Sequence, residues 1–130
     1  IDRALSRWPE IDAERQHLVA LWPQTREGQI RLDLDEQTRL IVVCGDALTS
    51  LSDWQQPFDA WYLDGFAPAK NPEMWSPEVM AEVARHTAPG GTFATYTAAG
   101  HVRASLAAAG FQVERVAGHG TKRHMTRGRR

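Results

Sequence analysis

The chain has 130 residues, 42% of them hydrophobic, which is enough apolar material for one core of ordinary density. Lys and Arg number 15 against 16 Asp and Glu, so the net charge of −1 neither requires nor excludes a polyanionic partner. The single cysteine excludes an internal disulfide, no Cys and His residues have zinc-ligand spacing, and no apolar run is long enough to cross a bilayer. We therefore expect one domain, residues 1–130, in the reducing cytoplasm, with no metal and no membrane partner.

The first part of the chain predicts one helix and two strands. Apolar residues at positions 11, 18, 21 and 22 have helical spacing, and Pro23 ends this helix before a predicted loop at residues 24–28. Alternating apolar residues at 30, 32 and 34 predict a half-buried strand. The apolar run 40–44, which includes Cys44, predicts a fully buried strand at residues 39–44.

The middle of the chain predicts a short helix at residues 47–54 and a third strand at 58–63. Gly65, Pro68 and Pro72 then indicate a loop. The sequence Ser-Pro-Glu at 76–78 is typical of a helix start, because it offers a capping hydroxyl, a proline at the first helical position and an acid near the positive end of the helix dipole.

The last part predicts a turn at residues 89–91, a strand at 92–97, a helix from about Val102 that stops at Gly110, and a final strand through residues 111–116. The last nine residues contain five Lys or Arg and no acid, which predicts a basic, frayed tail. Buried strands that alternate with helices predict an α/β fold with a largely parallel sheet covered on both faces.

Two acids follow predicted strands, and ligands of open parallel sheets bind beyond the carboxyl ends of the strands. Asp46, between Gly45 and Ala47, can accept a hydrogen bond from an adenine amino group, or it can simply cap the following helix. Asp64 follows an apolar run and opens the proline-containing loop, beside the aromatic residues Phe66 and Trp75. It is either part of a site or a residue that ties down the loop.

The sequence also resembles a known family. Residues 59–75 (DAWYLDGFAPAKNPEMW), 88–103 (APGGTFATYTAAGHVR), 109–111 (AGF) and 118–125 (GHGTKRHM) closely resemble the methyltransferase domain of the MnmC family. Enzymes of this family synthesise 5-methylaminomethyl-2-thiouridine at the wobble position of tRNA. The resemblance implies a Rossmann-like S-adenosylmethionine-dependent methyltransferase fold, of which this chain is the C-terminal part.

The resemblance implies methyl transfer from S-adenosylmethionine to the exocyclic amine of 5-aminomethyl-2-thiouridine in tRNA. Asp64 would then be catalytic, orienting the amine or accepting its proton, and Arg103 is a further candidate for a phosphate contact. The implied cofactor-binding residues are Gly45, Asp46, Ala47, Asp64 and Gly65. The implied substrate-binding residues are Phe66, Pro68, Lys70, Asn71, Trp75, Lys122 and Arg123.

In one respect the sequence departs from the family pattern. The glycine-rich loop after the first strand and the acid that ends the second strand, which hold the cofactor in such folds, are not among these residues. The expectation is a fragment that lacks the N-terminal strands and binds S-adenosylmethionine poorly by itself. FAD is expected only if a fused oxidase domain exists outside this chain, and no oligomeric state is indicated.

Three alternatives are weighed against this function. If the chain is a non-catalytic tRNA-binding or assembly module, Asp64→Ala in the complete domain leaves modification of tRNA unchanged. A methyltransferase for another amine or hydroxyl would turn over without tRNA. A nucleotide-dependent oxidoreductase would need a Gly-x-Gly-x-x-Gly turn, which this sequence does not contain.

Overall fold

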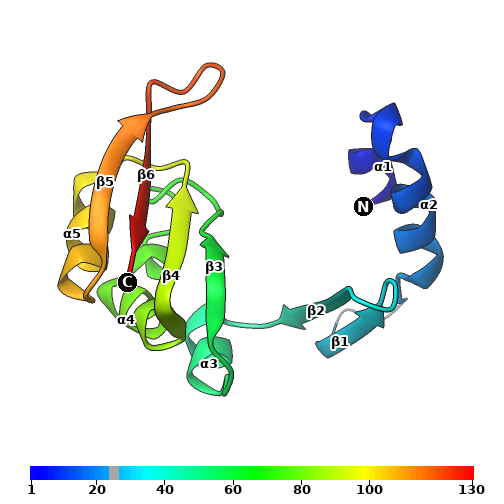
Figure 1. Cartoon of the computed structure of the whole chain (residues 1–130), viewed down its shortest axis with the longest axis horizontal. Helices are drawn as coiled ribbons and strands as arrows, with labels where there is room; N and C mark the ends of the chain where they lie inside the picture. Colours follow the sequence, from blue (N-terminus) through cyan, green and yellow to red (C-terminus); the bar gives the residue numbers. More distant parts are fainter. Residues whose placement is uncertain (24–26) are drawn as a thin grey trace. The chain divides into compact units, whose positions relative to one another are not determined.

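The structure, a computed structural model, describes residues 1–23 and 27–130. Contacts divide the chain into two compact units, residues 1–45 and 46–130, and each is described by itself. Figure 1 gives the element labels used below. The loop predicted at 24–28 lies largely outside the described residues; of its positions, Gly28 opens a strand.

Unit 1 contains short helical segments followed by a hairpin. Its helices are α1 (Asp2–Leu5), the 3-10 turn η1 (Pro9–Ile11) and α2 (Asp12–Leu21), and its strands are β1 (Gly28–Asp33) and β2 (Arg39–Cys44). The predicted helix before Pro23 is confirmed as α2. The Nε2 atom of His17 on α2 lies 2.7 Å from the carbonyl oxygen of Leu34, which links the helix to the hairpin.

The prediction that residues 30–34 and 39–44 join a parallel sheet as half-buried and fully buried strands is wrong. β1 and β2 pair antiparallel with each other, and Ile30 is opposite Val42. Residues 34–38 form a tight turn, in which Leu34 N donates to Thr38 O at 2.9 Å, and so short a connection leaves no room for a crossover helix. β2 is accordingly half-buried to exposed, and Cys44 is exposed rather than buried in a core.

Unit 2 is a four-stranded mixed sheet with helices packed on one face (Figure 1). The strand order is β3-β4-β6-β5, with β3 (Phe58–Tyr62), β4 (Thr87–Thr95), β5 (Gln112–Ala117) and β6 (His124–Arg129). The helices are α3 (Ala47–Ser52), the 3-10 turn η2 (Glu73–Trp75), α4 (Pro77–Arg85) and α5 (Gly100–Ala108). The α/β fold class is therefore confirmed.

The core of unit 2 lies between the sheet and the pair α4 and α5. Val83 on α4, Leu106 on α5 and Phe93 on β4 are each at most 2% exposed. The predicted start of α4 is confirmed, since Ser76 Oγ accepts a hydrogen bond from Val79 N at 3.3 Å. The predicted stop of α5 is confirmed too, because Gly110 has a φ of +103°, a conformation that favours glycine.

The prediction of a largely parallel sheet is wrong for this unit. β3 and β4 pair parallel, whereas β4 with β6 and β5 with β6 pair antiparallel. The cause is the short connection at residues 118–123, which returns the chain as a hairpin. The turn predicted at residues 89–91 lies inside β4 instead, where Gly90 N donates to Arg130 O at 3.2 Å and Arg130 N donates to Gly91 O at 2.9 Å.

The prediction of a frayed basic tail is also wrong, because residues 124–129 form β6, an inner strand of the sheet. Thr126 is completely buried, and a Cβ added at Gly128 would collide with the Phe93 ring. Residues 127 and 129 are exposed arginines that alternate with these inward positions. The sequence therefore has the two-residue period of a strand, which its many basic side chains conceal.

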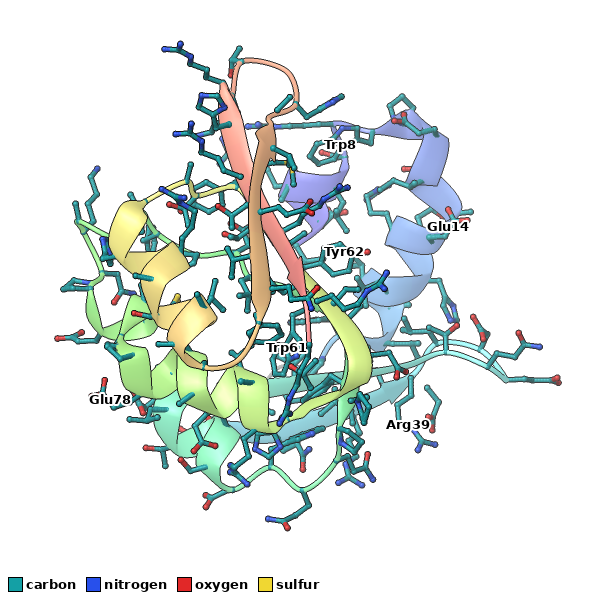
Figure 2. The ribbon with its side chains drawn as sticks, turned by 60° about the vertical axis from the view of Figure 1, so that its left-hand side comes forward. Trp8, Glu14, Arg39, Trp61, Tyr62 and Glu78 are labelled. Atoms are coloured by element: carbon teal, nitrogen blue, oxygen red, sulfur yellow. The ribbon has the colours of Figure 1, made fainter. Side chains whose placement is uncertain are left out.

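The opposite face of the sheet carries few large apolar side chains. Trp61 and Tyr62 are neighbours on β3 and point to different sides of it, as Figure 2 shows. Trp61 packs against the core, and its Nε1 donates a 2.9 Å hydrogen bond to Thr87 Oγ1. Tyr62 is 87% exposed and lines a depression of about 580 Å³ on the sheet face.

Candidate functional site

The carboxyl ends of β3 and β4 are neighbours, so residues that follow these two strands meet at one edge of the sheet. Leu63 N donates a 2.9 Å hydrogen bond to Ala94 O, which extends the pairing one residue beyond β3. Asp64 comes next and is exposed. Its Oδ1 accepts a 2.8 Å hydrogen bond from Gly65 N, and its Oδ2 has no hydrogen-bond partner within the described residues. One carboxylate oxygen is thus free to bind a ligand.

The two backbone carbonyls after Asp64 are both held by aromatic side chains. The hydroxyl of Tyr96 donates to Gly65 O at 2.6 Å, and Trp75 Nε1 donates to Phe66 O at 2.8 Å. The Trp75 and Tyr96 rings meet edge to face with centroids 6.2 Å apart. Trp75 is only 3% exposed, so its indole is a fixed anchor. Contacts from Tyr96, which follows β4, and from Trp75 in η2 therefore hold the backbone at residues 65 and 66.

Gly65 is required at its position for a packing reason. A Cβ added there would lie 2.5 Å from the Sδ atom of Met74. The thioether thus occupies the space that a side chain at residue 65 would need. Met74 and Trp75, both in η2, hold the loop from one side.

The rest of the loop presents candidate substrate-binding residues to solvent. Lys70 N and Asn71 N both donate to Ala67 O, at 2.7 and 3.1 Å, which closes a turn. Phe66 is 74% exposed although its carbonyl is anchored. Lys70 is also exposed, whereas Pro68 and Asn71 are half-buried. An exposed ring on a fixed backbone is a suitable stacking surface for a base.

The β5–β6 connection brings basic residues to the same edge. The Nζ atom of Lys122 lies 5.2 Å from the centroid of the Tyr96 ring, a cation–π distance. Gly118 N donates to Arg123 O at 3.2 Å, and this carbonyl closes the hairpin while the Arg123 side chain stays exposed. Asp64, Tyr96 and Lys122 are therefore linked through one chain of contacts.

Arg103 lies on α5, the helix that follows β4. It is half-buried, and its Nε atom has no hydrogen-bond partner in the described part of the chain.

Asp46 is not joined to this group. Its Oδ1 accepts hydrogen bonds from Thr49 N at 2.9 Å and from the Thr49 hydroxyl at 3.0 Å, so it caps α3. The hydrogen bond from the Thr49 backbone lowers the pKa of the Asp46 carboxyl below its usual value of 3.8. Ala47 is the half-buried first residue of α3, and Gly45 is the exposed last residue of unit 1. Among the described residues of unit 2, no hydrogen bond connects Asp46 or Ala47 with Asp64 or Gly65.

One depression of unit 2 is separate from these residues. It lies on the sheet face and is lined by side chains of all four strands, among them Tyr62, Gln112, Glu114 and Arg127, but not by Asp46, Ala47, Asp64 or Gly65. Glu114 and Arg127 pair across it at 3.1 Å. Over residues 1–23 and 27–130, no group of three or more His, Cys, Asp or Glu side chains could hold a metal ion.

Sequence reasoning missed Tyr96. No local signal marked it, because Tyr96 lies inside the predicted strand 92–97, whereas the structure ends β4 at Thr95 and so leaves Tyr96 just after its strand. A buried or half-buried tyrosine needs a partner for its hydroxyl, and that partner is a carbonyl of the Asp64 loop.

Comparison with known proteins identifies the family of this chain. The model of the S-adenosyl-L-methionine-dependent methyltransferase family matches residues 9–130. The chain belongs to this family. Membership confirms the methyltransferase fold and S-adenosylmethionine dependence expected from the sequence.

Curated relatives confirm the resemblance to MnmC. The tRNA 5-methylaminomethyl-2-thiouridine biosynthesis bifunctional protein MnmC of Pseudomonas savastanoi is 47% identical over 129 residues, 98% of this chain and 20% of the relative. Its counterpart from Ectopseudomonas mendocina is 48% identical over the same coverage. The methyltransferase chain thus spans about one fifth of the length of these relatives. A crystal structure of MNMC2 from Aquifex aeolicus matches with a TM-score of 0.70 and 27% identity, over 88% of this chain and 35% of that one.

Two candidate cofactor residues of this methyltransferase already have close contacts within unit 2. The Asp46 side chain is engaged in the first turn of α3, and Met74 fills the space beside Gly65. What unit 2 offers is the free carboxylate oxygen of Asp64 on an anchored loop. In the described part of the methyltransferase, no helix is long and apolar enough to cross a membrane.

Proposed function

We propose that this methyltransferase methylates the exocyclic amine of 5-aminomethyl-2-thiouridine at the wobble position of tRNA, with S-adenosylmethionine as methyl donor. The observation that carries the proposal is the exposed Asp64 carboxylate on a backbone held by Tyr96 and Trp75. The similarity to MnmC proteins supports the choice of substrate. A tRNA substrate in turn favours a cytoplasmic location.

The reaction is a displacement at carbon. The donor supplies a methyl group on a sulfonium, and the amine nitrogen forms a bond to that carbon as the carbon–sulfur bond breaks. The nitrogen then carries an extra proton, which must leave. The free oxygen of Asp64 is available to orient the amine through an N–H hydrogen bond and to accept this proton or pass it to water.

Recognition of the substrate is divided between two surfaces. The exposed Phe66 ring, with Pro68 and Asn71 beside it, would stack on and frame a base that has left its helical stack. Lys70, Lys122 and Arg123 would contact phosphates, which position an RNA without reading its sequence. Trp75 is buried and would act indirectly, because its indole holds the backbone carbonyl of Phe66.

For the cofactor, Gly45, Asp46, Ala47, Asp64 and Gly65 remain the proposed contacts. The 130 residues contain no glycine-rich turn of the kind that wraps the methionine part of the donor. We therefore expect this chain alone to bind S-adenosylmethionine only weakly. Micromolar binding by these residues in isothermal calorimetry would contradict that expectation.

The test uses the complete product of the reading frame that encodes this chain, with methyl-labelled S-adenosylmethionine. Three acceptors are compared: tRNA that carries 5-aminomethyl-2-thiouridine, the same tRNA with an unmodified wobble uridine, and a small primary amine. The proposal predicts label only in the wobble nucleoside of the first tRNA. Label in the free amine would indicate a methyltransferase for another substrate. Binding of tRNA without any transfer would indicate a non-catalytic module.

A further inference from the structure

Tyr96 occupies a special position relative to the Asp64 loop. It directly follows β4, whereas Asp64 follows the neighbouring parallel strand β3. Its hydroxyl makes a short hydrogen bond, 2.6 Å, to the carbonyl of Gly65, the residue next to Asp64. The peptide that contains this carbonyl links Gly65 to Phe66, so the contact limits rotation of the backbone between the carboxylate and the exposed ring.

We propose that Tyr96 is a positioning residue of the methyltransferase: its hydroxyl fixes the orientation of the Asp64 loop for reaction. The inference rests on the proposed role of Asp64. Displacement at a methyl carbon requires near-linear alignment of the nucleophile and the leaving group, and small misplacements are costly. The hydrogen bond from Trp75 to Phe66 O fixes only the next carbonyl, so it does not replace that from Tyr96.

The ring of Tyr96 has a second contact that the hydroxyl does not share. Lys122 Nζ lies over the ring face, 5.2 Å from its centroid. The Tyr96 ring also packs edge to face with Trp75. Because a phenylalanine at position 96 would keep both ring contacts and lose only the hydroxyl, Tyr96→Phe isolates the hydrogen bond to Gly65.

The chain contains its own control. Its only other tyrosine, Tyr62, is 87% exposed, and its hydroxyl makes no hydrogen bond within the described residues. Tyr62→Phe therefore removes the same atom from the end of the neighbouring strand without releasing the loop.

The experiment compares both variants with the unsubstituted, complete gene product in two measurements. The first is hydrogen–deuterium exchange of the backbone amides at residues 63–71. The second is the kcat and KM for the tRNA substrate, measured well below the melting temperature of each protein. We expect Tyr96→Phe to exchange faster in this segment and to lose about tenfold or more in kcat with KM within about twofold, since geometry rather than binding is affected. Tyr62→Phe should match the unsubstituted protein in both.

Equal exchange and equal kcat in the two variants would overturn the inference. Unchanged exchange with a lower melting temperature alone would also overturn it, because that result indicates a purely structural tyrosine. If the unsubstituted protein does not methylate the tRNA, the proposed function fails, while the exchange comparison still decides whether Tyr96 fixes the loop.

Discussion

The indole Nε1 of Trp75 donates a 2.8 Å hydrogen bond to the backbone carbonyl of Phe66, nine residues earlier in the chain. The contact joins a nearly fully buried side chain to the loop that carries Asp64. The sequence alone does not decide whether this loop is scaffold or site. The hydrogen bond gives the loop a defined shape.

Trp75→Phe removes this hydrogen bond and also replaces a nearly fully buried indole with a smaller ring. We expect the free energy of unfolding to fall by about 2–4 kcal/mol, because the lost hydrogen bond and the cavity both contribute, and kcat for the tRNA to fall several-fold. Trp61→Phe is the matched control, because Trp61 Nε1 makes a similar 2.9 Å bond to Thr87 at the opposite end of the sheet. The free energy of unfolding of Trp61→Phe should also fall, and its kcat should stay unchanged. Equal loss of kcat in both variants would contradict a specific role for Trp75.

Lys122→Gln and Arg123→Gln should weaken tRNA binding regardless of RNA sequence. If each side chain contacts one phosphate, each substitution reduces the magnitude of the slope of the log association constant against the log salt concentration by about 1. Filter binding at several salt concentrations measures both quantities. Arg39→Gln controls for the change in net charge, because Arg39 is paired with Asp33 at 2.6 Å in unit 1. An unchanged salt slope for Lys122→Gln would show that its ammonium serves only the Tyr96 ring.

Asp46→Ala should destabilise the protein near neutral pH, since it removes the cap of α3. The pKa of Asp46 is lowered in the folded state, so its contribution is fully present above the unfolded value of 3.8 and is lost as the pH falls through the folded value. Urea denaturation at pH 7 and near pH 3 measures the free energy of unfolding of both proteins. The difference between wild type and variant should be smaller near pH 3 than at pH 7. An equal difference in the free energy of unfolding at both pH values would contradict stabilisation of α3 by the ionised Asp46 carboxylate.

The same variant examines the proposed cofactor contact. If the Asp46 carboxylate only caps α3, S-adenosylmethionine affinity of the folded Asp46→Ala protein will equal that of the unsubstituted one. If it also binds adenine, affinity will fall while Thr49→Val, which loses only the hydroxyl contact to Asp46, binds normally.

Gly128→Ala should destabilise unit 2 by about 1–3 kcal/mol, because the new methyl group would overlap Phe93 and the carbonyl of Gln112. Gly100→Ala is the control: it opens α5, its φ is not in the left-handed region, and a Cβ there has no neighbour within 4 Å. Equal denaturation midpoints for the two variants would contradict β6 as an inner strand.

Features set by neighbouring residues could be predicted from the sequence, whereas strand pairing could not. Local signals sufficed where they were strong, as at Ser76, which caps α4, and at Gly110, which ends α5. They failed where pairing is long-range. The basic side chains of β6 conceal a strand whose burial comes from Phe93 and Gln112 far along the chain, and strand direction depends on connection length rather than on apolar runs.

The candidate site was predictable in part for the same reason. Asp64 and Phe66 were found because they follow a strand and match a family motif. The hydrogen bond that holds the backbone between them comes from Tyr96, about 30 positions later, and no local pattern reveals such a pair.

The most direct test of the account is the rate of methyl transfer to the wobble nucleoside by Asp64→Asn in the complete gene product, with Asp59→Asn as control. Asp59 is an exposed acid on β3, the strand that precedes Asp64, and its side chain has no hydrogen bond in the described residues. We predict that Asp64→Asn loses roughly 100-fold or more in kcat, the scale of a lost acid–base group, while Asp59→Asn keeps full activity. Undiminished transfer by folded Asp64→Asn would contradict the account.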